Sequence, residues 1–235
     1  MNGRPVRQRG VALFFVLVMV LLGTLLAAWT ARTVRFNELV TGNDADYQRA
    51  LQAAQAMVRD AELDIRGQRP DGSPCRTAPG YEGSCRLTRL DAEAGQVFFP
   101  RDTGDFQDLS IALAGRTPSC IKGICLGAKL APEFWRGQTA ANGFEAMKKV
   151  AARYGEFTGA TVADKGGDPL LMAGQDQAWY WVEVLPYDMG AAAADPFRPD
   201  AQRPFAYRIT AVAQGRKQAS LAVVQTVFIW RRVDS

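Results

Sequence analysis

Residues 11–31 read VALFFVLVMVLLGTLLAAWTA, a run of uncharged and mostly apolar side chains. As an α-helix this run would be about 31 Å long, which matches the hydrocarbon core of a bilayer. Arg4, Arg7 and Arg9 precede it without an acidic residue, so the positive-inside rule places the N-terminus in the cytoplasm. We therefore expect a single-pass inner-membrane protein whose remaining residues lie in the periplasm.

The alternative for this run is a secretory signal peptide that is cut near Ala27–Ala31, where small residues cluster. Two observations favour a retained membrane helix. The apolar run is longer than the hydrophobic part of a usual signal, and no proline interrupts the chain from Val11 to Arg69. A helix over residues 11–66 can therefore continue past the membrane span 11–31.

Beyond the span the helix changes from apolar on all sides to amphipathic. Apolar residues recur at spacings of three, four or seven and should form one buried seam, with Asp46 and Asp60 among the polar residues between them. The seam residues are Val40, Tyr47, Leu51, Ala54, Val58, Ala61 and Ile65. The second half of the helix therefore needs a folded domain to pack against, whereas the first half needs lipid or a bundle of helices.

Glycine and proline are frequent in residues 67–83, which predicts an irregular loop after the helix. Cys75 and Cys85 bracket part of this stretch, and a second pair, Cys120 and Cys125, follows. Four cysteines outside the membrane indicate two disulfides in an oxidising periplasm. Of the three possible connectivities we favour the pairing of sequence neighbours, because each bond would then fix a loop. Zinc is the alternative, but neither pair has the two-residue spacing of a zinc knuckle.

Three strand-like runs end the chain, at residues 179–185, 205–213 and 219–230, with a compact turn at 215–217 between the last two. They predict an antiparallel meander of at least three strands. Packed on the polar half of the long helix, such a sheet would bury the seam. The fold class is therefore α+β, with a long N-terminal helix on an antiparallel β-meander.

Two further segments complete the expected outer domain. Residues 143–154 predict a short helix, with Asn142 and Glu145 as a capping pair at its start. Residues 186–204 contain four prolines and predict a long exposed loop.

The residue inventory excludes several classes of enzyme. The chain has no histidine, which removes Ser-His-Asp triads, Cys-His pairs and histidine-ligated metals. Two groups of spaced aspartates could hold calcium, but neither fits the EF-hand spacing, and loop aspartates usually cap turns and helices. These groups are Asp102, Asp105 and Asp108, and Asp164 with Asp168. We expect no catalytic residue, no metal and no cofactor, and therefore no enzyme.

The charge distribution does not favour nucleic acid as a partner. The chain has 28 basic and 24 acidic side chains, but residues 1–10 hold three of the arginines, and 25 basic side chains remain against 24 acidic ones. The basic cluster Lys148, Lys149 and Arg153 is expected to form a solvated face. The pair Trp179 and Trp181 could stack on a ligand, but such residues in a strand usually fill a core.

The N-terminus carries a resemblance to a known family. Arg-Gln-Arg-Gly-Val-Ala-Leu at residues 7–13, ahead of a long apolar helix, resembles the prepilin-peptidase signal of type IV pilin-like proteins. The stretch 41–62 is similar to the N-terminal region of PilX-type minor pilins, as is Tyr-Arg-Ile-Thr at 207–210 with the strand that follows. The resemblance implies a basic leader that is removed after Gly10, and an N-methylated Val11 as the first mature residue.

One position departs from the family pattern. Most pilins carry a glutamate five residues into the mature chain, and this position is Phe15 here. A buried amino terminus without a countercharge is costly, and the glutamate of one subunit is thought to neutralise the terminus of its neighbour. The K-type minor pseudopilin of type II secretion shares this lack, which suggests a place at or near the filament tip. The alternative is that Phe15 is merely tolerated in a subunit of low abundance.

The resemblance implies a minor pilin that takes part in initiating type IV pilus assembly and supports adhesion and twitching motility. Its implied partners are other minor pilins, a tip adhesin, the major pilin, the inner-membrane assembly platform, prepilin peptidase and, before assembly, membrane lipid. The outer domain, residues 67–235, would display the surface that partners recognise, finally on a pilus at the cell surface. The alternatives are a K-type tip pseudopilin of a type II secretion system and a membrane-tethered periplasmic enzyme or binding domain.

Overall fold

The computed structural model describes most of the chain, with side chains from Ala12 onward. The described residues are 9–75, 85–86, 98–127, 130–137, 143–163, 166–172, 174–188, 190, 198–217 and 220–231. Residues 1–8 of the expected leader, Asn142, Asp164 and parts of both expected loops lie outside them. The chain divides into two compact units, residues 1–45 and 46–235.

The long helix α1 extends over Arg9–Arg66, so its first part belongs to the first unit and its last part to the second. No proline breaks the backbone hydrogen bonds of the helix. It ends where Gly67 adopts a φ of +63° and Gln68 donates its N–H to the carbonyl of Leu63 at 2.9 Å. This is a glycine-terminated helix end, and the long helix expected from the sequence is confirmed.

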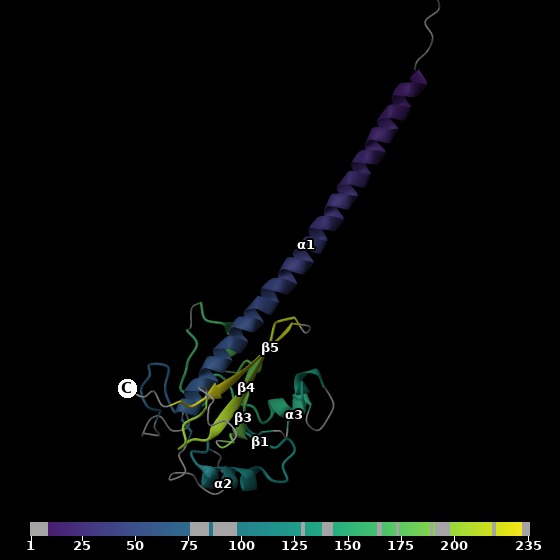
Figure 1. Cartoon of the computed structure of the whole chain (residues 1–235). Helices are drawn as coiled ribbons and strands as arrows, with labels where there is room; N and C mark the ends of the chain where they lie inside the picture. Colours follow the sequence, from purple (N-terminus) through teal and green to yellow (C-terminus); the bar gives the residue numbers. More distant parts are fainter. Residues whose placement is uncertain are drawn as a thin grey trace, which may run out of the picture. The chain divides into compact units, whose positions relative to one another are not determined.

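The second unit is built on a five-stranded sheet in the order β1-β2-β3-β4-β5. Its three long strands are β3 (Ala178–Pro186), β4 (Phe205–Gln214) and β5 (Leu221–Ile229), which pair antiparallel. Figure 1 shows these strands side by side, with the last turns of α1 against them. The α+β fold and the antiparallel meander predicted from the sequence are therefore confirmed.

Two short strands were not expected. β1 (Cys120–Ile121) and β2 (Ile124–Leu126) form a small hairpin, and β2 pairs parallel to β3. A strand of two or three residues is too short to show an alternation of apolar and polar side chains. In addition, the part of β3 that pairs with β2 lies more than fifty residues away in the chain. The hairpin turn contains Lys122 and Gly123, both with positive φ.

Both faces of the sheet carry core residues, although Val227 of β5 is 57% exposed. One face, with Tyr180, Val182 and Ile209, packs on residues of α1 and on α2 (Thr103–Leu113). The other face carries Trp179 and Trp181, which are fully buried as expected of core residues. A second cluster covers them with the two cysteines of the small hairpin, Phe134 of the 3-10 helix η1 (Phe134–Arg136) and two residues of α3 (Phe144–Lys148).

The buried face of α1 confirms the expected seam in part, since Ala54, Ala61 and Ile65 are buried. Its centre is formed by small residues and one methionine with no exposed surface: Ala50, Ala53, Ala54, Met57 and Ala61. Tyr47 of the expected seam is 43% exposed, whereas Asp46 and Asp60, expected among the polar residues, are buried. Alanines let the helix approach the sheet closely, and each buried aspartate finds hydrogen-bond donors on other elements.

The short helix expected over residues 143–154 ends early. α3 covers only Phe144–Lys148, because the chain then turns and joins the edge of the sheet. Ala152 and Tyr180 exchange two backbone hydrogen bonds at 3.1 and 3.0 Å. Sheet pairing therefore overrides the helical periodicity of this segment. A second 3-10 helix, η2, follows at Pro169–Leu171.

Candidate functional site

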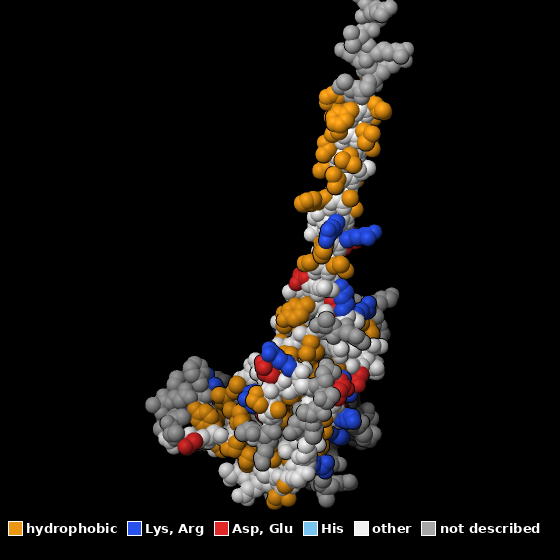
Figure 2. All heavy atoms as spheres, turned by 90° about the vertical axis from the view of Figure 1, so that its right-hand side faces the viewer, with side chains coloured by type: hydrophobic (Ala, Val, Ile, Leu, Met, Phe, Trp, Pro, Cys, Tyr) orange, Lys and Arg blue, Asp and Glu red, His pale blue; other side chains and the backbone are white. Residues whose placement is uncertain are grey.

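The first candidate site is the apolar surface of α1 in the first unit. From Leu13 to Trp29 the large hydrophobic side chains are 51–76% exposed, apart from Val18. Figure 2 shows hydrophobic atoms gathered along this part of the helix. Among the described residues, α1 is the one helix long and apolar enough to cross a membrane, with a mean hydropathy of 2.6 in its most apolar window. Such a surface needs lipid or other apolar helices as its environment.

The few polar side chains in this region satisfy their own hydrogen bonds. Thr24, Thr30 and Thr33 donate their hydroxyls to the carbonyls one turn earlier, at 2.8, 2.9 and 3.0 Å. Threonines that bond to their own helix backbone are compatible with an apolar environment. These three threonines therefore need no polar partner outside the helix if this part of α1 spans a membrane.

The residues singled out near the N-terminus lie on the same helix. Gly10 and Val11 belong to its first turn, since α1 begins at Arg9. Phe15 is 62% exposed and has the ring of Phe14 as a neighbour, with 6.3 Å between the ring centres. Phe15 therefore presents an apolar surface where a carboxylate would be expected in most pilins.

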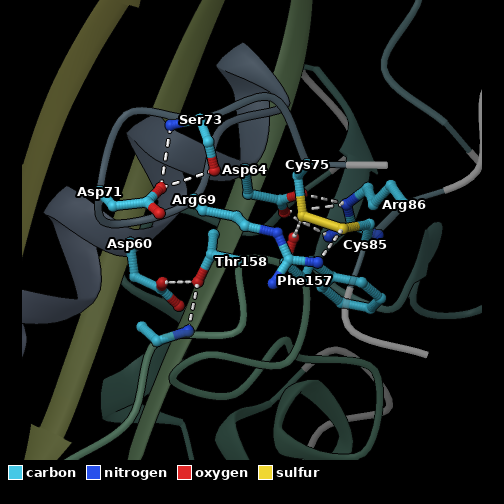
Figure 3. The surroundings of a disulfide bond; sticks show 11 residues. Asp60, Asp64, Arg69, Asp71, Ser73, Cys75, Cys85, Arg86, Phe157 and Thr158 are labelled. Atoms are coloured by element: carbon cyan, nitrogen blue, oxygen red, sulfur yellow. Dashed lines mark hydrogen bonds and ion pairs between the residues drawn. A yellow bond between two sulfur atoms is a disulfide. The ribbon is translucent and has the colours of Figure 1, made fainter. Parts of the chain in front are cut away.

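The second candidate site is a buried polar cluster where the last turns of α1 meet the sheet (Figure 3). Asp60 accepts the N–H of Gly155 at 2.8 Å and the hydroxyl of Thr158, both from the turn after α3. Burial raises the pKa of Asp60 to about 6, although both hydrogen bonds oppose this shift. Asp60 therefore fixes a distant turn to α1 while it bears an unfavourable charge at neutral pH.

Asp64 lies one turn further along α1 and has only 1% of its side chain exposed. Arg86 reaches its two carboxylate oxygens through Nε at 2.9 and 2.8 Å, and Tyr180 donates its hydroxyl at 2.8 Å. Burial raises the pKa of Asp64, and the Arg86 charge opposes this shift. Burial, followed by the charge of Asp64, raises the pKa of Tyr180 well above its ordinary value.

The disulfides follow the expected pairing of sequence neighbours. Cys75 is joined to Cys85, with Cα atoms 5.6 Å apart, next to the buried cluster. Cys120 is joined to Cys125 across the small hairpin, where the two residues are direct partners in the ladder. All four cysteines are therefore bonded in pairs within the second unit.

A third contact joins the start of the second unit to the last hairpin. Asp46 accepts the backbone N–H groups of Arg216 and Lys217 at 3.1 and 3.0 Å, in the turn between β4 and β5. The hydrogen bond from Lys217 is the largest cause of a lowered pKa for Asp46. The three buried aspartates of α1 thus hold three different parts of the unit: the hairpin turn, the turn after α3 and the chain next to Cys85.

The aspartates considered for calcium have structural roles where they are described. Asp102 caps α2 by accepting the N–H of Asp105 at 2.9 Å, and Asp105 accepts the N–H of Arg101. Asp105 and Asp108 therefore lie in a capped helix, which the sequence pattern did not indicate. Asp168 caps η2 in the same way, through the N–H of Leu170. In the described part of the chain, no three His, Cys, Asp or Glu side chains gather to hold a metal ion.

Of the basic residues near α3, Lys149 is exposed as expected, whereas Lys148 and Arg153 are only partly solvated. The Lys148 ammonium lies 5.0 and 5.2 Å from the ring centres of Phe144 and Trp179, and it pairs with Glu145 at 2.6 Å. The Arg153 guanidinium lies 5.9 Å from Trp179. These cations cover the edge of the tryptophan core, a role the sequence pattern did not indicate.

An exposed apolar helix, joined to an α+β unit in which the end of that helix covers a sheet, defines a pilin-like protein. The comparison with family models agrees with this class. The model for the C-terminal part of type IV pilus assembly protein PilX matches residues 99–229, and the PilX N-terminal model matches residues 9–59. The first match alone covers more than half of the chain, which therefore belongs to the PilX family of type IV pilus minor pilins. No curated protein and no solved structure matches the chain.

Family membership sets the functional meaning of the two candidate sites. Proteins of this family are structural components of the pilus and interact with other pilus components. The apolar surface of α1 is the part suited to a membrane and to helix packing. The buried cluster instead stabilises the second unit. The sequence did not indicate it, because Asp60 and Asp64 lie outside the apolar seam and nothing in the sequence around Arg86 marks it as a buried residue.

Proposed function

We propose that this minor pilin takes part in initiating type IV pilus assembly and occupies a place at or near the filament tip. The observation that carries the proposal is Phe15, an exposed apolar side chain in place of a carboxylate. A subunit without that carboxylate cannot neutralise the amino terminus of a neighbour packed beside it. It is therefore suited to a position where one side of its helix has no such neighbour.

The proposal includes the route by which the subunit reaches the filament. Prepilin peptidase removes residues 1–10 after Gly10, and Val11 becomes the N-methylated first residue. Before assembly, α1 anchors the subunit in the inner membrane with its N-terminus in the cytoplasm and the second unit in the periplasm. The arginines before the apolar run support this orientation.

The proposed partners are other minor pilins, a tip adhesin, the major pilin and the inner-membrane assembly platform. Helix packing through the apolar surface of α1 is the interaction with the shaft, and the second unit contacts the subunits around it. A subunit that starts filaments affects every activity that needs them. Adhesion and twitching motility therefore depend on this protein in the proposal.

The processing step is tested by mass spectrometry of the mature N-terminus from membrane and sheared-pilus fractions. We expect a methylated Val11 in the wild type and an uncut chain in Gly10→Val. Gly3→Val is the matched control, because it alters a glycine of the leader away from the cut, and it should be processed normally. An intact Met1 start in cells with working prepilin peptidase, or a cut near Ala31, would contradict the proposal.

The tip position is tested by immunogold labelling of filaments. We expect label at filament ends in the wild type and along the shafts in Phe15→Glu, because the new carboxylate can neutralise a neighbouring terminus. Phe14→Glu places the same charge on another side of the helix and should not move the label to the shafts. Label along the shafts in the wild type would exclude the tip position.

A further inference from the structure

Arg86 is held in an unusually enclosed position for a cation. Its side chain is 7% exposed, and its Nη2 donates to the carbonyl of Lys122 at 2.7 Å in addition to the bonds to Asp64. The guanidinium lies 3.7 Å from the ring centre of Phe157 and 5.1 Å from that of Phe99. Figure 3 shows it directly beside the Cys75–Cys85 disulfide.

Arg86 provides the opposite charge next to Asp64. Among the described residues, Arg86 is the Lys or Arg that forms an ion pair with Asp64, and Tyr180 contributes a neutral hydroxyl. Asp60, on the same helix, adds a second buried carboxylate nearby. Removing the guanidinium would leave Asp64 as an uncompensated charge between α1 and the sheet, which is strongly unfavourable.

The disulfide and one backbone hydrogen bond link the chain at Arg86 to the end of α1. Cys85 is the residue before Arg86, and its partner Cys75 donates its backbone N–H to the carbonyl of Gly67 at 2.8 Å. Gly67 follows the last residue of α1, three positions after Asp64. The sulfur bridge therefore holds the backbone at Arg86 near the helix turn that carries the opposite charge.

We propose that the Cys75–Cys85 disulfide is a redox-sensitive switch that sets the charge balance between α1 and the sheet by holding Arg86 against Asp64. In the oxidised state the ion pair is formed and α1 is seated on the sheet. The reduced state forms when a dithiol reductant passes two electrons and two protons to the S–S bond and becomes a disulfide itself. Arg86 is then free to leave, and the unpaired Asp64 weakens the packing of α1. The Cys120–Cys125 disulfide closes the hairpin that contains Lys122, whose carbonyl accepts a hydrogen bond from Arg86. Neither of its cysteines is next to Arg86 or to the end of α1 in the chain, so we do not expect it to hold Arg86 against Asp64.

The proposal is tested by placing Asp64→Asn in three backgrounds of the full chain in detergent and comparing thermal midpoints. With both disulfides intact, Asp64→Asn should lower the midpoint by about 5 to 10 °C, because it leaves Arg86 buried without its partner. With Cys75→Ser and Cys85→Ser it should leave the midpoint unchanged or raise it, since it removes the unpaired charge. With Cys120→Ser and Cys125→Ser it should lower the midpoint as in the wild type.

Equal lowering in all three backgrounds would overturn the proposal, because the disulfide would then act independently of the charge. A second measurement covers the case in which the Cys75→Ser and Cys85→Ser chain does not fold. The oxidised full chain is equilibrated with dithiothreitol, which passes two electrons and two protons to the S–S bond and becomes a cyclic disulfide itself. Alkylation and mass spectrometry then give the fraction of each cysteine pair in the thiol form.

Both Arg86→Met and Asp64→Asn should increase the equilibrium constant for opening Cys75–Cys85 by about tenfold or more. In Asp64→Asn, the constant for Cys120–Cys125 serves as the internal control and should stay as in the wild type. Arg86→Met also removes a hydrogen bond to Lys122 in that hairpin, so this control applies to Asp64→Asn alone. If the two variants open Cys75–Cys85 no more readily than the wild type does, the disulfide and the ion pair are not coupled and the proposal fails.

Discussion

At the scale of single residues, the second unit is held together by charges placed inside it. Asp60 is 2% exposed and accepts hydrogen bonds from Gly155 and Thr158, which lie nearly a hundred residues away in the chain. Among the described residues, every buried side-chain nitrogen and oxygen has a hydrogen-bond partner. These bonds fix distant segments to α1, but they do not fully offset the loss of water around the carboxylate.

Asp60 predicts a pH dependence of stability. Its pKa is about 6 in the folded chain against an ordinary value of 3.8, so the folded state holds the proton more tightly than the unfolded state. The stabilisation of the folded state that proton binding by Asp60 provides is complete below the unfolded pKa of 3.8. It is lost as the pH rises through about 6. Relative to Asp60→Asn, the wild type should therefore lose on the order of 2 kcal/mol of unfolding free energy between about pH 4 and pH 7.

Urea unfolding of both chains over this pH range checks the prediction. Asp44→Asn is the matched control, because Asp44 lies on the exposed side of the same helix. Its profile should follow that of the wild type. A difference between wild type and Asp60→Asn that stays constant with pH would show that Asp60 does not titrate in this range.

At the scale of elements, α1 combines two kinds of helix surface in one continuous structure. In the first unit its large apolar side chains are exposed, whereas from Asp46 onward a face of alanines packs on the sheet. The alanine face explains how a helix with several buried polar residues can still lie close to β3 and β4. Larger side chains there would hold the helix away from the sheet and from its hydrogen-bond partners.

Ala53→Leu tests the close packing of this face. Ala53 has no exposed surface and belongs to the cluster that includes Met57 and Tyr180, so a leucine must displace its neighbours. We expect the free energy of unfolding to fall by about 1 to 3 kcal/mol. Ala45→Leu, at an exposed position of the same helix, should change it little. Denaturant unfolding of the full chain in detergent measures both, and equal effects would contradict the packing of Ala53.

At the scale of the whole molecule, the described core belongs to the second unit alone. Its first buried residue is Asp46, and both hydrophobic clusters are formed by residues from Ala50 onward. The first unit contributes an apolar helix surface that is exposed along its length. In the proposed function, this division lets α1 exchange lipid for neighbouring subunits while the second unit stays folded.

Removal of residues 1–40 tests this division. The remaining chain keeps one helical turn before Asp46 and all described core residues, so it should be soluble without detergent and keep both disulfides. Its thermal unfolding should be a single cooperative transition, with a midpoint within a few degrees of that of the full chain. Circular dichroism and thiol titration measure these properties. A non-cooperative transition would show that the first unit is needed for the fold of the second.

The sequence by itself determined the features that depend on local pattern. Hydropathy and the absence of proline define α1, and short separations along the chain favour the two disulfides between sequence neighbours. Alternation defines β4, whereas aromatic, β-branched and apolar runs define β3 and β5. The α+β class follows from these elements, because an amphipathic helix and a half-covered sheet must bury each other.

Only the tertiary structure decided which polar groups are buried and where short segments pair. Asp64, Arg86 and Tyr180 come from three separate parts of the chain, and nothing around any one of them indicates the other two. The early end of α3 and the parallel pairing of β2 likewise depend on β3, far away in sequence. A buried charge or a two-residue strand is stable only because of contacts that folding brings together, so local sequence cannot encode it in a recognisable pattern.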